Sequence, residues 1–200
     1  MKSLNFTRNL LSIFVLAFTF LIVGSVEGQA TLPVNATFAS ATSSTYTLPT
    51  GFSQTGVASY NGALKFDTQG DQLILFFTGI PNTLSFDLGV NNSFSGTLPS
   101  GLTFSVFESE NGISWNLIST YSAGNSLGTK SIQINGLSRY IQWTFTLKPS
   151  GYNVAIKNIN VSKALEWTGG LNNIWSNTSN WSTGVIPPTT SNIVIPGNLA

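Results

Sequence analysis

The middle of the chain consists of short apolar runs with the spacing of β-strands, and this pattern restricts the possible folds most strongly. Seven runs rich in β-branched and aromatic residues are separated by Gly, Asn, Ser and Pro, and are expected to be strands: 71–78, 83–89, 102–109, 114–121, 130–136, 139–148 and 152–162. Beyond the N-terminal segment, no stretch shows a helical period. Strands at this spacing predict an all-β fold, an antiparallel β-sandwich.

Alternation within the strands predicts which side chains lie in the core. In the run 139–148 every second residue is large and apolar: Ile141, Trp143, Phe145 and Leu147. This is the period of a strand with one face buried, so Trp143 is expected inside. We also expect Trp115 in the core, because a large ring gains most from burial.

Two local features follow from the strand boundaries. Asn111-Gly112 lies between two expected strands and predicts a tight hairpin turn, because both residues tolerate a positive φ. The last strand keeps its alternation through Ile156 and then shifts by one position at Asn158, which predicts a β-bulge.

Residues 1–28 have the layout of a secretory signal peptide. Lys2 and Arg8 precede an apolar run from Leu10 to Val23, and small residues follow. This run is shorter than the roughly 20 residues that a bilayer-spanning helix needs. The pattern predicts a secreted or cell-surface protein with no membrane span after the signal is removed.

The composition excludes several kinds of chemistry. Charged residues make up 8% of the chain and the net charge is +1, so a cationic surface for nucleic acid is not expected. Cysteine and histidine are both absent. A Ser-His-Asp triad, a Cys-His nucleophile and an ordinary zinc site are therefore excluded, and the domain needs a hydrophobic core in place of disulfides.

Three runs carry a resemblance to a known family. The runs "FSVFESENGISWNLI" (104–118), "LSRYIQWTF" (137–145) and "AIKNINV" (155–161) resemble the second half of discoidin-like, galactose-binding-like jelly rolls, modules common in secreted proteins of Bacteroidetes. The resemblance covers residues 45–163 and implies a jelly-roll sandwich there, with residues 29–44 as a linker. It also implies that ligand meets the loops at one end of the sandwich.

Six loop residues are the candidate ligand contacts. They are the tyrosines and asparagines of three expected loops: Tyr60, Asn61, Asn91, Asn92, Tyr152 and Asn153. Tyr and Asn suit sugar hydroxyls and sugar rings, and loops on a rigid scaffold commonly carry binding residues. The same residue types are also ordinary in turns, so both interpretations stay open.

The acidic residues offer a metal site and a catalytic pair. Asp67 and Asp71 flank the loop "DTQGD", whose oxygens are of the type that Ca²⁺ prefers, so a structural Ca²⁺ is one interpretation and a polar turn is the other. Glu108 and Glu110 are two residues apart at a strand end, and Arg139 is expected to pair with one of them. A glycosidase needs two carboxylates across a cleft, and no cleft is indicated, so no enzyme activity is expected.

The C-terminal stretch 164–200 concentrates tryptophan. Trp167, Trp175 and Trp181, spaced with Gly184 and Pro187, resemble the opening of a repeat module of large secreted and surface proteins of Bacteroidetes. Where that family has an Asp, this chain has Ser191 and Asn192. The resemblance implies the start of a second, truncated β-rich module. An aromatic sugar-binding strip is the alternative.

Together these features predict a non-catalytic extracellular binding or adhesion module for polysaccharide or a cell-surface glycan, at the front of a larger secreted or cell-surface protein. A structural spacer that carries an enzyme or an adhesive domain is the alternative, and a glycoside-active enzyme ranks behind both. No cofactor other than the structural Ca²⁺ is expected.

Overall fold

The fold is known from a computed structural model of the 200-residue chain, which describes residues 28–38, 46–169 and 173–196. The expected signal peptide, residues 1–28, lies outside this range except for its last residue. Within the described ranges, no helix has the length and apolar character needed to cross a membrane.

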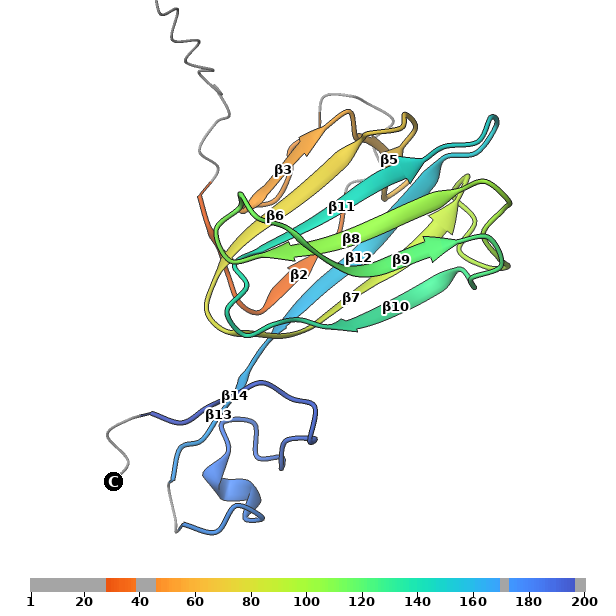
Figure 1. Cartoon of the computed structure of the whole chain (residues 1–200). Helices are drawn as coiled ribbons and strands as arrows, with labels where there is room; N and C mark the ends of the chain where they lie inside the picture. The colour runs from red at the N-terminus through yellow and green to blue at the C-terminus, as the bar shows by residue number, and fades with distance from the viewer. Residues whose placement is uncertain (1–27, 39–45, 170–172, 197–200) are drawn as a thin grey trace, which may run out of the picture.

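Two sheets face each other and form a β-sandwich (Figure 1). The first sheet has the order β1-β6-β11-β8-β9, with β3 also beside β6. Its strands are β1 (Ala30–Thr31), β3 (Phe52–Thr55), β6 (Gln72–Thr78), β8 (Thr103–Ser109), β9 (Asn116–Ser122) and β11 (Tyr140–Leu147). All of its pairs are antiparallel except β1 with β6, which is parallel.

The second sheet has the order β10-β7-β12-β5-β4, with β2 also beside β12. Its strands are β2 (Val34–Ala36), β4 (Ala58–Tyr60), β5 (Ala63–Phe66), β7 (Pro81–Val90), β10 (Gly128–Gln133) and β12 (Val154–Lys163). Every pair in this sheet is antiparallel. The expected antiparallel β-sandwich is therefore confirmed as the fold.

Alternation places the core between the two sheets, as the sequence pattern predicts. On β6, Leu73, Leu75 and Phe77 are fully buried while their neighbours are half-buried on the outer face. Trp143 on β11 is 0% exposed, and its ring meets Phe86 of the opposite sheet edge to face at 5.9 Å. The prediction that Trp143 lies in the core is confirmed.

The prediction for Trp115 is wrong. This residue lies in the loop before β9 and is only half-buried, with its ring edge against Tyr140 at 6.3 Å. Tyr140 stacks in turn on Phe76 at 4.4 Å, on the outer face of the first sheet. A loop residue has no strand alternation that would direct it inward, so the sequence pattern could not fix its side.

The expected hairpin at Asn111-Gly112 is a longer loop. Residues 110–115 connect β8 to β9, and the Asn111 side-chain oxygen accepts the N–H groups of Ile113 and Ser114. Two-residue turns with positive φ instead occur at Asn61-Gly62 and Asn91-Asn92. An asparagine that bonds to the backbone two residues on favours the wider loop.

The predictions for the two ends of the domain have different outcomes. Asn158 has a φ of 51° and the register of β12 against β7 shifts between Lys157 and Asn160, so the expected β-bulge is confirmed. The expected linker 29–44 contains the strands β1 and β2, so the sandwich begins earlier than the predicted residue 45. Val34 and Ala36 of β2 are buried in the core. These short strands are stabilised by pairing with β6 and β12. The sequence of a run of two or three residues does not reveal such a distant partner.

The tail forms a small unit at one end of the sandwich (Figure 1). It contains the parallel pair β13 (Leu165–Glu166) and β14 (Ile193–Val194) and the 3-10 helix η1 (Thr178–Asn180). Its three tryptophans pack on one another: the rings of Trp167 and Trp175 are stacked at 5.7 Å, and Trp181 stands across both at 4.9 and 4.5 Å.

One side chain joins the tail to the sandwich. The Asn192 amide nitrogen Nδ2 donates to the carbonyl oxygens of Pro81 and Ile134, each at 2.7 Å, and the Asn192 backbone N–H donates to Asn82 Oδ1 at 2.9 Å. Because only an amide can donate to two carbonyls here, an Asp at this position would lose both bonds.

Candidate binding site

A hollow of about 240 Å³ opens on the outer face of the second sheet, beside the start of β12. It is lined by Tyr60, Lys65, Asn91, Asn92, Asn153, Val154 and Ala155. Ala155 pairs with Lys65 of β5 on one side and with Gly89 of β7 on the other. Since Val154 and Ile156 point into the core, Ala155 faces outward and contributes to the floor.

The edge hairpin β4-β5 provides one wall. The turn Asn61-Gly62 has positive φ at both residues, which matches the twist of a two-residue hairpin and sets the register Tyr60 to Ala63. Tyr60 is 42% exposed, so much of its ring can be contacted from solvent. Lys65 lies near it, with Nζ 6.0 Å from the Tyr60 ring centroid and 2.7 Å from Asp67 Oδ2.

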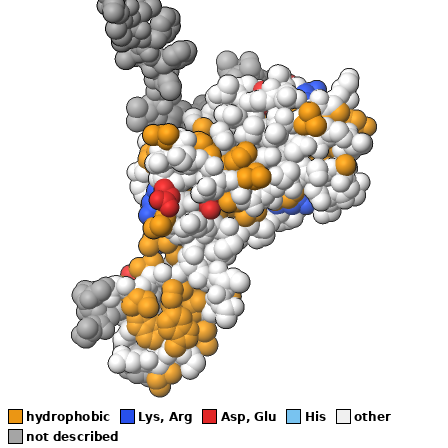
Figure 2. All heavy atoms as spheres, viewed as in Figure 1, with side chains coloured by type: hydrophobic (Ala, Val, Ile, Leu, Met, Phe, Trp, Pro, Cys, Tyr) orange, Lys and Arg blue, Asp and Glu red, His pale blue; other side chains and the backbone are white. Residues whose placement is uncertain are grey.

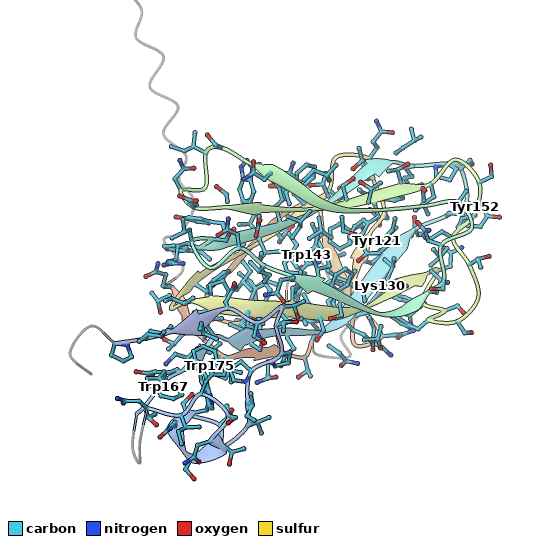
Figure 3. All side chains as sticks on the ribbon, turned by 60° about the horizontal axis from the view of Figure 1, so that its bottom comes forward. Tyr121, Lys130, Trp143, Tyr152, Trp167 and Trp175 are labelled. Atoms are coloured by element: carbon cyan, nitrogen blue, oxygen red, sulfur yellow. The ribbon has the colours of Figure 1, made fainter. Side chains whose placement is uncertain are left out.

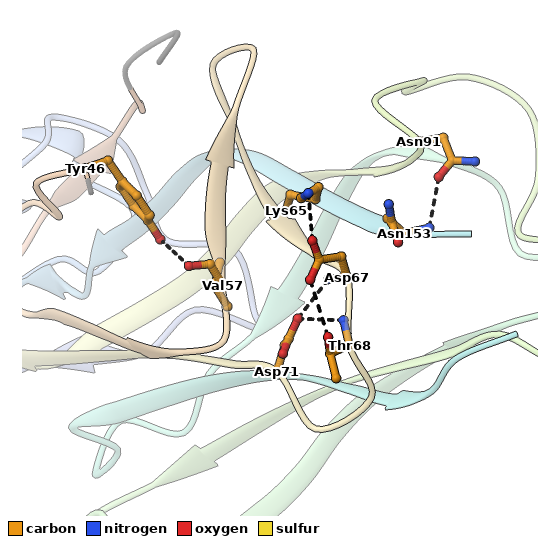
Figure 4. A network of polar contacts seen from close by, with 8 residues as sticks. All are labelled: Tyr46, Val57, Lys65, Asp67, Thr68, Asp71, Asn91 and Asn153. Atoms are coloured by element: carbon orange, nitrogen blue, oxygen red, sulfur yellow. Dashed lines mark hydrogen bonds and ion pairs between the residues drawn. The ribbon is translucent and has the colours of Figure 1, made fainter. Parts of the chain in front are cut away.

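Two loops form the opposite wall, and Asn91 ties them together. Its Oδ1 accepts the Asn153 N–H at 2.9 Å, its Nδ2 donates to the Gly151 carbonyl at 3.1 Å, and its backbone N–H donates to the Asn153 carbonyl at 2.9 Å. Figure 4 shows the Asn91 side-chain bond to Asn153. Both ends of the Asn91 amide are thus used within the protein, so this residue fixes the shape of the wall.

The other two asparagines of this wall have unused amides. The side chains of Asn92 and Asn153 make no hydrogen bond to any residue that the structure describes, and Asn92 Oδ1 is buried without a partner. Asn92 has a φ of 65°, a left-handed conformation that asparagine tolerates better than most residues. Asn92 Oδ1 is enclosed by the protein, so the groups of this wall that a polar ligand can reach are Asn92 Nδ2 and the Asn153 amide.

The structure brings four of the six candidate contacts to one hollow. Tyr60, Asn91, Asn92 and Asn153 line it, whereas Asn61 and Tyr152 lie in the adjoining turns and do not. The sequence reasoning missed Lys65, Val154 and Ala155. Lys65 had a usable signal, because it alternates with the apolar Leu64 and Phe66 and therefore faces outward.

The electrostatic character of the hollow is nearly neutral. Lys65 is its charged residue, and the ion pair with Asp67 offsets that charge. Behind β4, the Tyr46 hydroxyl donates to the Val57 carbonyl at 3.3 Å, and burial raises the pKa of Tyr46 to about 12 (Figure 4). Burial also raises the pKa of Tyr121, which lies on β9 of the first sheet. Because Asp67 offsets the charge of Lys65, the hollow favours a neutral, hydroxyl-rich ligand.

The two acids expected to hold Ca²⁺ are engaged by N–H groups of the protein. Asp71 Oδ2 accepts the backbone N–H groups of Asp67 and Thr68, each at 2.8 Å, while Asp67 pairs with Lys65. No group of three or more His, Cys, Asp or Glu residues that could hold a metal lies in the described ranges. Asp71 therefore acts as the brace of the 67–71 loop, and the structural Ca²⁺ stays a prediction.

The glutamates expected as a carboxylate pair are separated in environment. Glu108 is buried, and its Oε2 accepts the Asn135 N–H at 2.9 Å and the Ser138 hydroxyl at 3.0 Å. Glu110 is exposed. Arg139 donates to the carbonyls of Gly136 and Ser138 and has no ion pair among the described residues, so the expected pairing is wrong. Backbone carbonyls beside Arg139 offer nearer acceptors than either carboxylate.

The comparisons with known proteins give structural likenesses without sequence support. No model of a protein family matches the chain, and no curated protein matches it. One similar solved structure is a mutant of a family 29 carbohydrate-binding module complexed with mannohexaose. It is 18% identical, has a TM-score of 0.45, and the match covers 66% of this chain and 93% of that chain.

A second is a mutant of the same module complexed with cellulohexaose, 16% identical with a TM-score of 0.43, covering 66% of this chain and 92% of that chain. Likenesses at these identities and TM-scores carry no argument about function, so the function is inferred from the geometry of the chain's own hollow.

Proposed function

We propose that this chain is a non-catalytic, extracellular carbohydrate-binding module that holds a neutral sugar in the Tyr60 hollow. One observation carries the proposal: an exposed tyrosine ring and two unused asparagine amides line the same hollow on a nearly uncharged surface. The signal-peptide pattern of residues 1–28 supports export to where polysaccharides are met.

Each part of the hollow has a role with a sugar. The Tyr60 ring offers an apolar face for the C–H side of a pyranose, and the Tyr60 hydroxyl remains available to water or ligand. The Asn153 amide offers donors and an acceptor, and Asn92 Nδ2 offers donors, which match sugar hydroxyls because hydroxyls both donate and accept. Asn91 fixes the wall before the ligand binds, so little conformational entropy is lost on binding.

Binding without catalysis is favoured by the position of the acids. Lys65 and Asp67 neutralise each other beside the hollow, and Glu108 is occupied by two donors elsewhere. Glycoside hydrolysis needs two carboxylates roughly 5–10 Å apart across the sugar. The hollow is lined by no carboxylate among the described residues.

Calorimetric titration of the whole chain with mannohexaose and with cellulohexaose tests the proposal. We expect Tyr60→Ala to weaken binding of the sugar that binds by roughly tenfold or more, because the stacking face is lost. Tyr152→Ala is a matched control: Tyr152 is 40% exposed, close to the 42% of Tyr60, but does not line the hollow. Equal losses for both variants, or no binding of either hexaose, would contradict the proposal.

A spacer function has one observation in its favour, the Asn192 link. Its three hydrogen bonds attach the tail to the end of the sandwich and so fix the direction in which the chain continues. In this second proposal the tail, with its resemblance to a surface-protein module, is the element that a rigid sandwich holds in place. The two functions are compatible, since they use opposite parts of the domain.

A further inference from the structure

We infer that the ligand is a linear glycan that runs along β12, from the Tyr60 hollow to a second hollow at the Asn158 bulge. This inference depends on the proposed function and extends it from a single sugar to a chain of several. The class of ligand is thus a soluble or surface-displayed linear polysaccharide, contacted along its length.

The second hollow has a volume of about 140 Å³ and lies where β2 meets β12. It is lined by Asn35, Ala36, Thr37, Asn158, Ile159 and Asn160. Three of these are asparagines. This hollow therefore repeats the amide-rich, nearly neutral character of the first one.

Both hollows lie on the same outer face of the same strand. Ala155 is part of the first hollow, Lys157 is the next outward residue, and Asn160 lines the second hollow. With a rise of about 3.3 Å per residue, positions 155 and 158–160 are roughly 10–16 Å apart along the strand. That separation exceeds the width of one sugar ring and suits a chain of a few.

The β-bulge creates the second hollow. Because Asn158 is an extra residue in the register, both Asn158 and Asn160 remain on the outer side of the strand. Asn158 Nδ2 donates to Asp87 Oδ2 at 2.7 Å, and Asn160 Nδ2 donates to Asn35 Oδ1. These bonds orient the two amides and leave their carbonyl oxygens to accept hydroxyl groups.

Lys157 of β12 and the Phe94 ring lie on the outer face of the sheet between residues 155 and 158 of the strand. The Phe94 ring lies against Gly89, the partner of Ala155 in the sheet, and a Cβ on Gly89 would come within 2.9 Å of that ring. Lys157 Nζ lies over the Phe94 ring, 4.0 Å from its centroid, which is a cation–π contact. An aromatic ring and an ammonium donor between two amide-rich hollows match the apolar C–H faces and the hydroxyl groups of a glycan chain.

The test is a length series of cello- and manno-oligosaccharides, from the disaccharide to the hexasaccharide, titrated into the whole chain. We expect affinity to rise by roughly tenfold or more from disaccharide to hexasaccharide, because the longer sugar reaches the second hollow. Asn158→Gly removes the amide and keeps the positive φ, since glycine adopts it freely. This variant is expected to lose severalfold affinity for the hexasaccharide and none for the disaccharide.

The outcomes separate the two proposals. Ser131→Ala, on exposed β10 of the same sheet, is the control and should bind like the unchanged chain. Equal affinity for all lengths with sensitivity to Tyr60→Ala would overturn the linear ligand and keep the sugar site. No binding of any oligosaccharide would overturn both. A hexasaccharide affinity unchanged in Asn158→Gly, with its thermal midpoint also unchanged, would overturn the second hollow.

Discussion

The sandwich and the tail bury tryptophan in two different ways (Figure 3). Trp143 is enclosed between two six-stranded sheets and is 0% exposed. In the tail, Trp167 and Trp181 are buried mainly against each other and against Trp175, which stays 46% exposed. One ring is held by strands far apart in sequence, whereas the other three hold one another within a short segment.

The difference teaches how much apolar surface each architecture can cover. The tail leaves large apolar side chains in solvent, and Figure 2 shows hydrophobic side chains gathered on its face. The exposed ones are Ile174, Trp175, Val185, Ile186 and Ile195. With one short strand pair and one turn of 3-10 helix, the tail has too few elements to enclose them. It therefore depends on its link to the sandwich.

The largest effect is expected at Trp143. Replacing Trp143 by Ala should lower the free energy of unfolding by about 3–5 kcal/mol, because a cavity opens between the sheets. Trp143→Phe should cost clearly less, since the indole Nε1 has no hydrogen-bond partner among the described residues and its loss breaks no bond. Urea unfolding followed by circular dichroism measures both. A loss of the same size for Trp175→Ala would remove the contrast between the two regions.

A smaller effect is expected where the two regions join. Asn192→Asp replaces two donated hydrogen bonds with a carboxylate facing the Pro81 and Ile134 carbonyls. We expect the attachment of the tail to weaken by about 1–3 kcal/mol, with little change in the sandwich. Hydrogen exchange at the Leu165 and Trp167 N–H groups, which bond to the β14 segment, measures it.

The matched control is Asn173→Asp, which adds the same charge to an exposed position of the tail. Faster exchange is expected for Asn192→Asp alone. If both variants exchange alike, charge rather than the lost donors is responsible, and the Asn192 link is not what holds the tail.

The smallest effect is expected at alkaline pH, within the sandwich. Burial raises the pKa of Tyr46 from 10.0 to about 12. The unfolded chain then releases this proton first as pH rises, so this contribution to stability is complete below pH 10.0 and declines up to about 12. The urea midpoint should fall over this interval and fall less in Tyr46→Phe. Tyr152→Phe, at an exposed tyrosine, should leave the slope unchanged.

Much of the sandwich could be predicted from the sequence, because alternation is a local signal. The seven expected strands correspond to β6 through β12, and their ends differ by a few residues at most. The early strands β1 to β5 were weaker signals. β2 has only the residues Val34–Ala36, and it exists because it pairs with Ile159–Val161 of β12. A run this short acquires its strand conformation from its partner.

The kinds of residue at the candidate site were predictable from the sequence, but only four of its seven lining residues were predicted. Asn61 and Asn91 both have positive φ in two-residue turns, and the same feature that makes asparagine suitable for a ligand makes it suitable for a turn. The structure separates the two uses: Asn91 braces the wall, while Asn153 keeps its amide unused. No sequence pattern carries that distinction, because it depends on where the neighbouring loop lies.

What the sequence by itself determined is the strand pattern, the bulge at Asn158 and the burial of Trp143, since each depends on a period of two along one strand. What the tertiary structure decided is which distant segments meet. The pairing of Ala155 with both Lys65 and Gly89 brings the edge hairpin and the 91–92 turn to the same hollow. Trp115 lies outside the core for a related reason: it is in the loop before β9, and its packing against Tyr140 of β11 is a tertiary contact that no local period encodes.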